Sequence, residues 1–462
     1  MTRTFTTLTA VATTVLALAA CQDNSLAPSR DQITTGSPQT LQTLATGVIA
    51  QNRTEAGLYV LYTNIMARDA IVLNSEPRFT SEFYQAQPDP YDFIGAASWA
   101  GSYQALRAIH SLFQSPAYTG LVDTVKKNAV AGAMRNIMLI AYLRIIETHD
   151  QNGMVIQSDN PTVLGPLKTK ASSLAYLSAL ADTAITNLRN GGTDVPFTLP
   201  SGYSLHGDYG TIANQLRLAH ALKGRIELSR ALSDPANPVP ANAATAIVEL
   251  DSALADAPGT VTQEYLNKGP WHEFNPLAPE STPNPLVSSA FFVTNNFVNS
   301  INPLDARKAN IVATSSTSAN GYSASNLWAP TDASVAGNKR LPIPIMRNAN
   351  AYLLRAQAKV LTNDLPGAAA DVSVVRQVEG HLPAYVTFAN ATAAIDAILY
   401  EYRYSFVYEG PQHLVALRQY GRFNLAYIQQ SGMPSPSTVV VQQLPIPGAE
   451  ASARDGNITP VP

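Results

Sequence analysis

The sequence contains one cysteine and few charged residues, and both shortages limit what the protein can be. Cys21 is the only cysteine in 462 residues, which excludes an internal disulfide framework and any metal site built from several cysteines. Charged residues make up 14% of the chain and the net charge is −3. Proteins that bind nucleic acid neutralise phosphates with clustered lysine and arginine, so this composition argues against that class. The hydrophobic share of 46% is sufficient for a sizeable core.

The N-terminus has the order of a secretory signal. Arg3 precedes an uncharged apolar run that ends in Leu-Ala-Ala-Cys at residues 18–21. That run is shorter than the roughly 20 apolar residues that span a bilayer, and no later segment is expected to span one. Cys21 falls where a bacterial lipobox places the lipid-modified cysteine; the alternative is a chance cysteine after an ordinary signal. We therefore predict a signal peptide over 1–20, a lipidated Cys21 as the sole membrane anchor, and a polar tether over 21–40.

Apolar residues recur every three or four positions through most of the chain, which predicts an all-α fold. One candidate pair lies in 349–376, where the first helix ends at Asn363-Asp364 and Pro366-Gly367 opens an alanine-rich second helix. Two helices joined by a short polar turn in about 34 residues form the tetratricopeptide pattern. We predict a single domain over 41–462 built from such pairs. The predicted helical stretches are 41–73, 98–113, 121–147, 172–190, 209–232, 243–257, 349–363, 366–380 and the segment from Ala391.

Two segments lack this periodicity. Residues 258–347 and 74–98 are rich in polar and turn-forming residues, with aromatic residues dispersed among them. Loops this long inside a compact protein are usually functional or disordered. Because both segments combine aromatic rings with amide and hydroxyl groups, we predict that they form the functional surface, with 258–347 as a loop-rich insertion.

Sequence signatures of catalysis are mostly missing. His272-Glu273 begins like the zinc-protease motif H-E-x-x-H, but position 276 is proline where the second histidine would stand. Residues 202–206 approach a nucleophile elbow but end in histidine in place of glycine. Residues 149–153 could coordinate a cation, although a polar turn explains them as well. With no phosphate-binding or dinucleotide fingerprint, we predict a protein that is not an enzyme and that uses no metal or cofactor.

The stretch EYRYSFVYEGPQHLVALRQYGRF, residues 401–423, concentrates tyrosine, arginine and apolar residues. Ile398, Tyr402 and Phe406 share one helical face. Gly410 is expected to end that helix and Pro411 to begin the next. An active site made of arginine and glutamate is one interpretation, and a helical hairpin fastened by ion pairs is the other. Since no nucleophile or metal-ligand set accompanies these charges, the packing role is favoured.

The same stretch resembles the near-C-terminal signature of SusD/RagB-type nutrient-binding lipoproteins, in which the pattern E-R-R-x-E-L-x-F-E-G-x-R-x-x-D-L-x-R-x-G-R is typical. Ser405 and Val415 replace polar positions of that pattern. Three other segments also resemble the family: 349–376 its last tetratricopeptide pair, 302–307 its D-P-R element, and 444–450 its closing P-I-P segment. Together with the lipobox these elements span nearly the whole chain in the expected order. The residues that match the signature are Glu401, Arg403, Phe406, Glu409, Gly410, Leu414, Arg418, Gly421 and Arg422.

The resemblance implies a surface-exposed outer-membrane lipoprotein that captures an oligosaccharide or a peptide and passes it to a TonB-dependent, SusC-like transporter. Such proteins are α-helical, with tetratricopeptide-like units supporting a loop-rich ligand face, and they bind rather than catalyse. A tetratricopeptide scaffold for outer-membrane assembly is the alternative, and a hydrolase acting on captured glycan is a third. A pure scaffold does not need the aromatic and polar insertion at 258–347, which favours a ligand.

Glycan-binding members of this family stack tryptophan or tyrosine on sugar faces and reach hydroxyls with polar side chains, because a sugar has an apolar C–H face and a polar rim. Trp99 lies within a helical pattern and is predicted to be core. The first loop region has no tryptophan, which departs from starch-binding members, and any ring could instead pack its own loop. The predicted ligand contacts are Arg78, Phe79, Tyr84 and Tyr91 from the first region and Trp271, Tyr322, Asn326 and Trp328 from the second.

Overall fold

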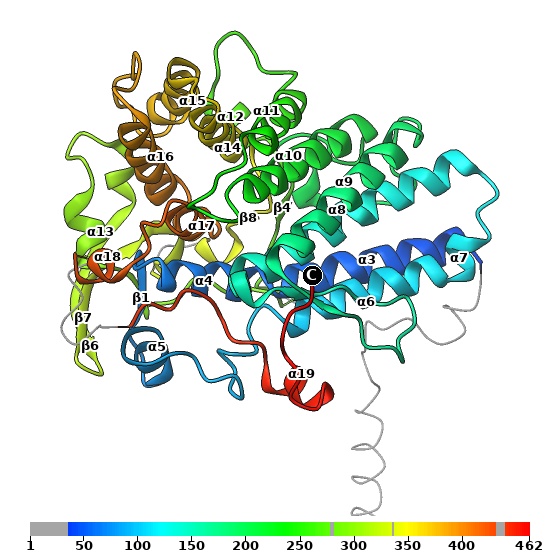
Figure 1. Ribbon diagram of the computed structural model, residues 1–462, viewed down its shortest axis with the longest axis horizontal. Coiled ribbons are helices and arrows are strands. Elements are labelled where there is room, and N and C mark those ends of the chain that lie inside the picture. The colour runs from blue at the N-terminus through cyan, green and yellow to red at the C-terminus, as the bar shows by residue number, and fades with distance from the viewer. Residues whose placement is uncertain (1–35, 278–280, 335–336, 431–438) are drawn as a thin grey trace, which may run out of the picture.

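The computed structural model describes residues 36–277, 281–334, 337–430 and 439–462, so Cys21 and the predicted signal peptide lie outside the described residues. Helices dominate this part of the chain (Figure 1), and the predicted all-α class is confirmed. The helices of eight or more residues are α3 (Pro38–Thr54), α4 (Ala56–Met66), α6 (Ala100–Gln114), α8 (Thr124–His149), α9 (Lys170–Arg189), α10 (Ile212–Ala231), α11 (Pro240–Ala253), α14 (Asn348–Leu361), α15 (Leu365–Val378), α16 (Ala391–Ser405) and α17 (Gln412–Gln419). Shorter helical elements are α5 (Arg78–Thr80), α7 (Pro116–Thr119), α12 (Gln263–Asn267), α13 (Asn295–Ser300), α18 (Leu425–Gln430), α19 (Gly448–Ala453), the π-helical η1 (Ser81–Gln85), and the 3₁₀ turns η2 (Asp150–Asn152), η3 (Ser201–Tyr203), η4 (Ala306–Asn310), η5 (Ala329–Thr331) and η6 (Asn338–Arg340).

Consecutive helices pack as pairs. α8 packs on α9, α10 on α11 and α14 on α15, while α11 also contacts α14, so the pairs form a row (Figure 1). The turn before α15 follows from its sequence, because Asp364 caps the helix by accepting a hydrogen bond from Gly367 N (2.9 Å) and Pro366 lies in the first turn. Ala356 and Ala368 are fully buried across this pair, and such small side chains let helices approach closely. The predicted pairs over 209–257 and 349–380 are therefore present.

The predicted helix over 41–73 is wrong in its extent. It divides at Glu55 into α3 and α4 and ends at Met66, and residues 70–72 form strand β1 (Ala70–Val72). The side chain of Glu55 lies against Gly101 in the first turn of α6. A Cβ added at Gly101 would lie 2.0 Å from Glu55 Oε1, so only glycine leaves room for this carboxylate. A carboxylate is favourable at a helix N-terminus. Residues 70–72 leave the helical pattern because they pair antiparallel with β5 (Phe291–Val293).

The segment 258–347, predicted to be loops, contributes most of a four-stranded sheet in the order β1-β5-β7-β6. β6 (Ile311–Ala319) and β7 (Tyr322–Trp328) form an antiparallel hairpin. Its turn is Asn320-Gly321 with φ values of 55° and 86°, and a type I′ turn needs a positive φ at both positions. The loop prediction is therefore wrong for this hairpin. Two short ladders complete the strands: β2 (Met154–Val155) with β3 (Leu167–Lys168), and β4 (Trp271–His272) with β8 (Ile343–Pro344).

The long helix α8 lies in the core. The segment Thr124–Asn152 is long and apolar enough to cross a membrane by length and composition alone, contrary to the expectation that no later segment would be. However, 94% of its most apolar window is buried inside the protein, among α3, α6, α9 and α10. Trp99, predicted to be core, is 5% exposed and packs in this apolar cluster. A second apolar cluster surrounds α4 and the four-stranded sheet.

Residues near the C-terminus form hydrogen bonds with the end of α8 and the start of α9. Nη1 of Arg418 donates to the carbonyl oxygen of Glu147 (2.6 Å). The backbone N–H of Leu444 donates to Thr148 O (2.9 Å), and that of Thr169, the N-cap of α9, donates to Val461 O (3.0 Å). The end of one core helix and the start of the next are thus completed by residues nearly 300 positions away.

The stretch 401–423 folds as a helical hairpin, as predicted, but its turn differs from the prediction. α16 ends at Ser405, before the expected cap at Gly410. Asn64 of α4 holds the turn, because its Oδ1 accepts from Tyr408 N (3.1 Å) and its Nδ2 donates to Gly410 O (3.2 Å). Tyr408, not the glycine, takes the positive φ of 58°. The expected cap at Gly410 is therefore wrong, and tertiary hydrogen bonds set the turn.

Buried ion pairs fasten this hairpin to distant segments. Glu401 is fully buried and accepts from Arg307 Nη1 (2.7 Å) and Arg376 Nη1 (3.2 Å). Arg347, the N-cap residue of α14, donates through Nε to Glu409 (2.7 Å). Burial raises the pKa of Glu409 to about 7, although the positive charge of Arg347 opposes that shift. The charges thus pair with one another across the fold, as the packing interpretation predicted.

Candidate functional site

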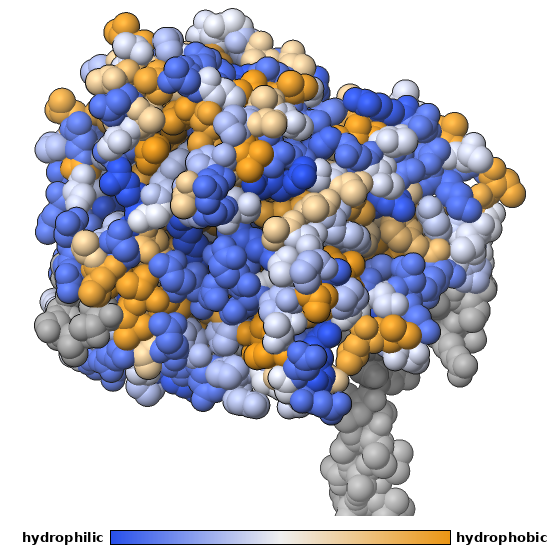
Figure 2. Space-filling model, viewed as in Figure 1, coloured by the Kyte–Doolittle hydropathy of each residue, from blue (hydrophilic) through white to orange (hydrophobic). Residues whose placement is uncertain are grey.

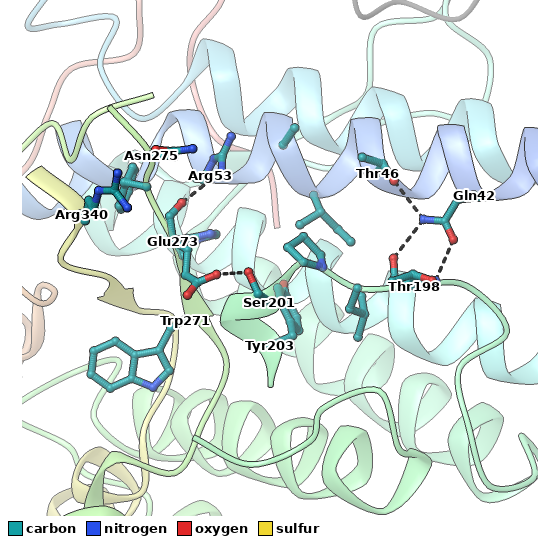
Figure 3. Close-up of a pocket in the computed structure, with 16 residues that line it drawn as sticks. Gln42, Thr46, Arg53, Thr198, Ser201, Tyr203, Trp271, Glu273, Asn275 and Arg340 are labelled. Carbon is teal, nitrogen blue, oxygen red and sulfur yellow. Dashed lines mark hydrogen bonds between the residues drawn. The ribbon is translucent and has the colours of Figure 1, made fainter. Parts of the chain in front are cut away.

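A hollow of about 610 Å³ opens between α3, the segment 198–203 and the segment 271–275 (Figure 3), and we call it the Trp271 hollow. Its volume falls within the range of about 300–1,000 Å³ that is usual for small-molecule sites. Trp271 lies at one end and Gln42 at the other in this view. The walls are formed by the apolar or aromatic residues Ile49, Ala50, Leu199, Pro200, Tyr203, Trp271 and Phe274 and by the polar residues Gln42, Thr46, Arg53, Thr198, Ser201, His272, Glu273, Asn275 and Arg340.

Helix α3 supplies one wall. Ser37 caps this helix by accepting a hydrogen bond from Thr40 N (3.1 Å). Gln42 and Thr46 follow four residues apart and therefore share a face. The Gln42 amide donates to Thr46 Oγ1 (3.0 Å) and to Thr198 O (3.0 Å), and its oxygen accepts from Thr198 N (2.7 Å). Gln42 thus joins the helix to the loop across the hollow and fixes the distance between them.

Strand β4 and the residues after it supply the opposite wall. Trp271 is 9% exposed and donates from its indole N–H to Asn267 O (3.0 Å), which fixes the ring. Glu273 hydrogen-bonds through its carboxylate to Ser201, and its carbonyl oxygen accepts from Arg53 Nη1 (3.0 Å) (Figure 3). Gly202 allows the segment 198–203 to approach β4, because a Cβ at this position would lie 2.3 Å from the carbonyl oxygen of Trp271.

The histidine in this wall is neutral. Nη2 of Arg144 lies 2.9 Å from His272 Nε2. Since arginine can only donate, Nε2 accepts and the imidazole proton is on Nδ1. Burial, with the positive charges of Arg144 and Arg53, holds the pKa of His272 well below its usual range. The hollow therefore presents fixed polar groups between apolar walls, an arrangement suited to a ligand with both apolar faces and hydroxyls.

The structure does not bring the eight predicted ligand residues together, and Trp271 is the one that lines this hollow. Trp328 is 5% exposed and lines a second hollow of about 450 Å³ together with Arg347 and Glu409. Tyr84 and Tyr322 are buried in the core around the sheet with ring centroids 5.2 Å apart.

The other predicted residues lie on β7 and in the first loop region. Asn326 is half-buried on β7 and its amide donates to the neighbouring Ser325 Oγ (3.3 Å). Arg78 is ion-paired with Glu76 (2.8 Å) and lies 4.4 Å above the ring centroid of Phe93. Phe79 is half-buried with its ring 5.6 Å from that of Phe93. Tyr91 is 77% exposed.

Several residues of the Trp271 hollow were missed in the sequence. Gln42, Thr46 and Arg53 lie in a stretch read only as a helix, yet their spacing places a polar stripe on one face of α3. Glu273 and His272 were weighed as zinc ligands and then set aside. Polar residues spaced along one face of this helix, together with a Trp-His-Glu run in a turn-rich segment, were the available signal. Nothing in the sequence indicated that the two segments would meet.

The loop of residues 76–95 is expected to loosen as pH rises. Burial, helped by a hydrogen bond with Asp92, raises the pKa of Glu82 to about 7, although the Asp89 N–H (2.9 Å) opposes this shift. In the unfolded loop the carboxyl titrates near 4.5. The folded loop therefore retains a proton that the unfolded loop loses, and its stabilisation, complete below pH 4.5, is lost as pH rises through about 7. Hydrogen–deuterium exchange of 76–95, corrected for intrinsic rates, should be faster at about pH 8 than at about pH 5.5.

A Glu82→Gln variant should lose this pH dependence because glutamine does not titrate. Glu264→Gln removes a carboxylate that is 72% exposed and should behave as the wild type. Equal pH dependence in the wild type and in Glu82→Gln would contradict the assignment to Glu82.

Solved structures of SusD-like proteins align with nearly the whole chain, and the predicted SusD-like fold is confirmed. Three solved structures illustrate it. A SusD-like carbohydrate binding protein from Bacteroides vulgatus aligns with a TM-score of 0.65 at 14% identity, over 93% of this chain and 99% of that one. A structure with a xylogluco-oligosaccharide aligns with a TM-score of 0.66 at 14% identity, over 90% and 99%. Surface glycan-binding protein A from Bacteroides thetaiotaomicron aligns with a TM-score of 0.65 at 13% identity, over 90% and 98%. No protein-family model and no curated protein matches the chain.

Proposed function

We propose that this protein is a surface glycan-binding lipoprotein that captures an oligosaccharide in the Trp271 hollow. The observation that carries the proposal is the hollow itself, whose apolar walls and fixed polar groups lie on a fold shared with carbohydrate-binding proteins. Aromatic side chains suit the C–H faces of a sugar, and Asn275 and Arg340 can meet its hydroxyls. Capture without turnover is favoured because, among the residues that the structure describes, Glu273 is the one carboxylate that lines the hollow, whereas glycoside hydrolysis generally uses two.

Within this proposal Trp271 is the principal ligand contact. Arg78 and Tyr91, which are accessible on the first loop, are proposed as contacts for a longer ligand, and Trp328 for a ligand that reaches the second hollow. Phe79 and Asn326 are half-buried and are proposed as secondary contacts. Tyr84 and Tyr322 are buried, so a ligand does not reach their rings in this conformation, and their predicted role requires a rearrangement. A peptide ligand remains the competing prediction.

Isothermal titration calorimetry tests the proposal directly. The purified protein would be titrated with a neutral xyloglucan oligosaccharide, a malto-oligosaccharide and a neutral tetrapeptide. Saturable binding of an oligosaccharide supports glycan capture. Binding of the peptide alone would replace the glycan with a peptide, and absence of binding across broad panels of both would sink the ligand-binding function.

We further propose that the protein is anchored to the outer membrane, faces the cell surface and passes its ligand to a TonB-dependent transporter. Gentle solubilisation of outer membranes, followed by mass spectrometry of what co-purifies, tests this partnership. A stoichiometric TonB-dependent barrel supports delivery to a transporter. Assembly or secretion machinery in its place would favour the tetratricopeptide scaffold.

Replacement of the proposed lipid attachment site should release the protein from the membrane. Cys21→Ser removes the thiol that the lipid would modify, and stable anchoring depends on buried acyl chains. Metabolic labelling with an alkyne fatty acid should mark the wild type and leave Cys21→Ser unmarked. Fractionation should find the variant in the soluble periplasmic fraction. Equal labelling and equal membrane retention of both proteins would rule out a lipid on Cys21.

A further inference from the structure

A separate hollow of about 440 Å³ lies where α16, α17 and α18 meet, and we call it the Tyr427 hollow. It shares no lining residue with the Trp271 hollow. In Figure 2, polar and apolar residues are interspersed over these three helices. Much of its lining comes from the stretch 401–423, in which most of the other charges are committed to packing.

The floor carries two basic side chains held by one buried carboxylate. Asp69, with 2% of its side chain exposed, accepts from Arg403 Nε (2.8 Å) and from His413 Nδ1 (2.6 Å). Nη2 of Arg403 donates to Asn296 Oδ1 (2.8 Å). Among the described residues, Nη1 of Arg403 and Nε2 of His413 make no hydrogen bond. Both side chains line the hollow, so its floor offers one fixed donor, Arg403 Nη1, and one ring nitrogen, His413 Nε2, which donates only when the imidazole is protonated.

The rim adds a third basic group with a weak partner. Arg422 faces Asp396 at 3.5 Å, with 43% and 62% of the two side chains exposed. In the described part of the chain, Asp396 is the one acidic residue in the lining, against the two arginines Arg403 and Arg422. Exposed ion pairs of this kind contribute little to stability, so Arg422 can leave Asp396 for a ligand at a small cost in free energy. The lining therefore favours a negatively charged group.

Two tyrosine rings form the sides. The hydroxyl of Tyr400 donates to Asp305 Oδ2 (2.8 Å), and that of Tyr427 donates to Ala67 O (2.7 Å). Both hydroxyls therefore donate to groups that do not line the hollow, and these hydrogen bonds hold the rings in place. The carbon surfaces of the two rings remain part of the lining. Fixed aromatic surface beside basic nitrogens suits a ring-shaped ligand that carries a carboxylate.

We propose that the Tyr427 hollow binds the carboxylate of a uronic acid residue in an acidic glycan. The carboxylate accepts from Arg403 Nη1 at the floor and from Arg422 at the rim, and the sugar ring packs against Tyr400 and Tyr427. The sugar identity of the ligand rests on the proposed glycan-binding function, but the site is independent of the Trp271 hollow.

The test uses tri-galacturonate and its fully methyl-esterified form, which differ in charge and not in ring structure. The chain contains seven histidines, and loss of one signal in His413→Gln identifies the ring signal of His413 in a histidine-labelled sample. Tri-galacturonate should shift that signal in the wild type and in Trp271→Phe, whereas the methyl ester should not. The response in Trp271→Phe separates this site from a failure of the Trp271 hollow.

Calorimetry supplies a second readout. Arg422→Gln should weaken tri-galacturonate binding by about fivefold or more, because it removes a charged hydrogen-bond donor. Arg189→Gln removes an equal charge at the exposed end of α9, away from α18 (Figure 1), and should leave binding unchanged. An unshifted His413 signal, or equal affinity for the methyl ester, would overturn the proposal. Equal binding of tetraglutamate would assign the hollow to acidic peptides instead.

Discussion

Trp271→Ala is expected to weaken oligosaccharide binding by at least about thirtyfold, which corresponds to the loss of about 2 kcal/mol at a buried aromatic contact. The indole is held by its hydrogen bond to Asn267 and lies 5.1 Å from the His206 ring, so alanine removes aromatic surface from the lining of the hollow. Trp271→Phe retains an aromatic ring and should lose less oligosaccharide affinity than Trp271→Ala. Calorimetry with the tightest oligosaccharide of the panel measures both losses.

Tryptophan fluorescence separates contact from misfolding. The chain has three tryptophans, and ligand binding should change the emission of Trp271. Trp271→Phe should abolish that change, whereas Trp99→Phe, in the core, should retain it. Circular dichroism must show that the variants are folded. A folded Trp271→Ala protein with wild-type affinity would show that the ligand binds elsewhere.

Glu401→Ala is expected to lower the free energy of unfolding by about 3–5 kcal/mol, the usual cost of removing one partner from a buried ion pair. Glu401 is fully buried, and its loss leaves Arg307 and Arg376 without the carboxylate that both contact. Urea unfolding followed by far-UV circular dichroism measures the change. Arg418→Ala should also destabilise, because it removes the donor that satisfies Glu147 O at the end of α8.

The matched control is Arg422→Gln, which breaks an exposed pair with Asp396. Arg422→Gln should lower the free energy of unfolding by less than about 1 kcal/mol. Neutral oligosaccharide affinity should change little in Glu401→Ala under conditions where it remains folded. If Glu401→Ala kept its stability and lost ligand binding, the stretch 401–423 would be a ligand platform and the packing role would be wrong.

Helical periodicity was sufficient to predict most of the fold. The stretches 121–147, 172–190 and 209–232 match α8, α9 and α10 closely, because long amphipathic or apolar segments have few other ways to bury their side chains. Residues 70–72 were assigned to a helix because their apolar pattern is too short to show a period of two. The hairpin at 311–328 was missed although Asn320-Gly321 marks its turn. Its serine- and threonine-rich strand β6 is mostly exposed and therefore lacks the apolar alternation of a half-buried strand.

The site was harder to predict than the fold. Trp271 was selected because a tryptophan in a polar, turn-rich segment has few roles other than packing or binding. Gln42 and Arg53 could not be selected, because the hollow depends on α3 meeting a loop more than 200 residues later in the chain. Tyr84 and Tyr322 show the converse, since composition cannot distinguish an exposed ring from one buried against a sheet.

The junction of α8 and α9 can be completed only late in synthesis of the chain. Both helices are complete once residue 189 has been made. Their junction, however, receives its hydrogen bonds from Arg418, Leu444 and Val461. An emerging chain therefore carries its longest apolar helix for more than 200 residues of synthesis before that junction is complete. A chain that ends before residue 444 lacks the Leu444 N–H that donates to Thr148 O, so the end of α8 would remain incomplete.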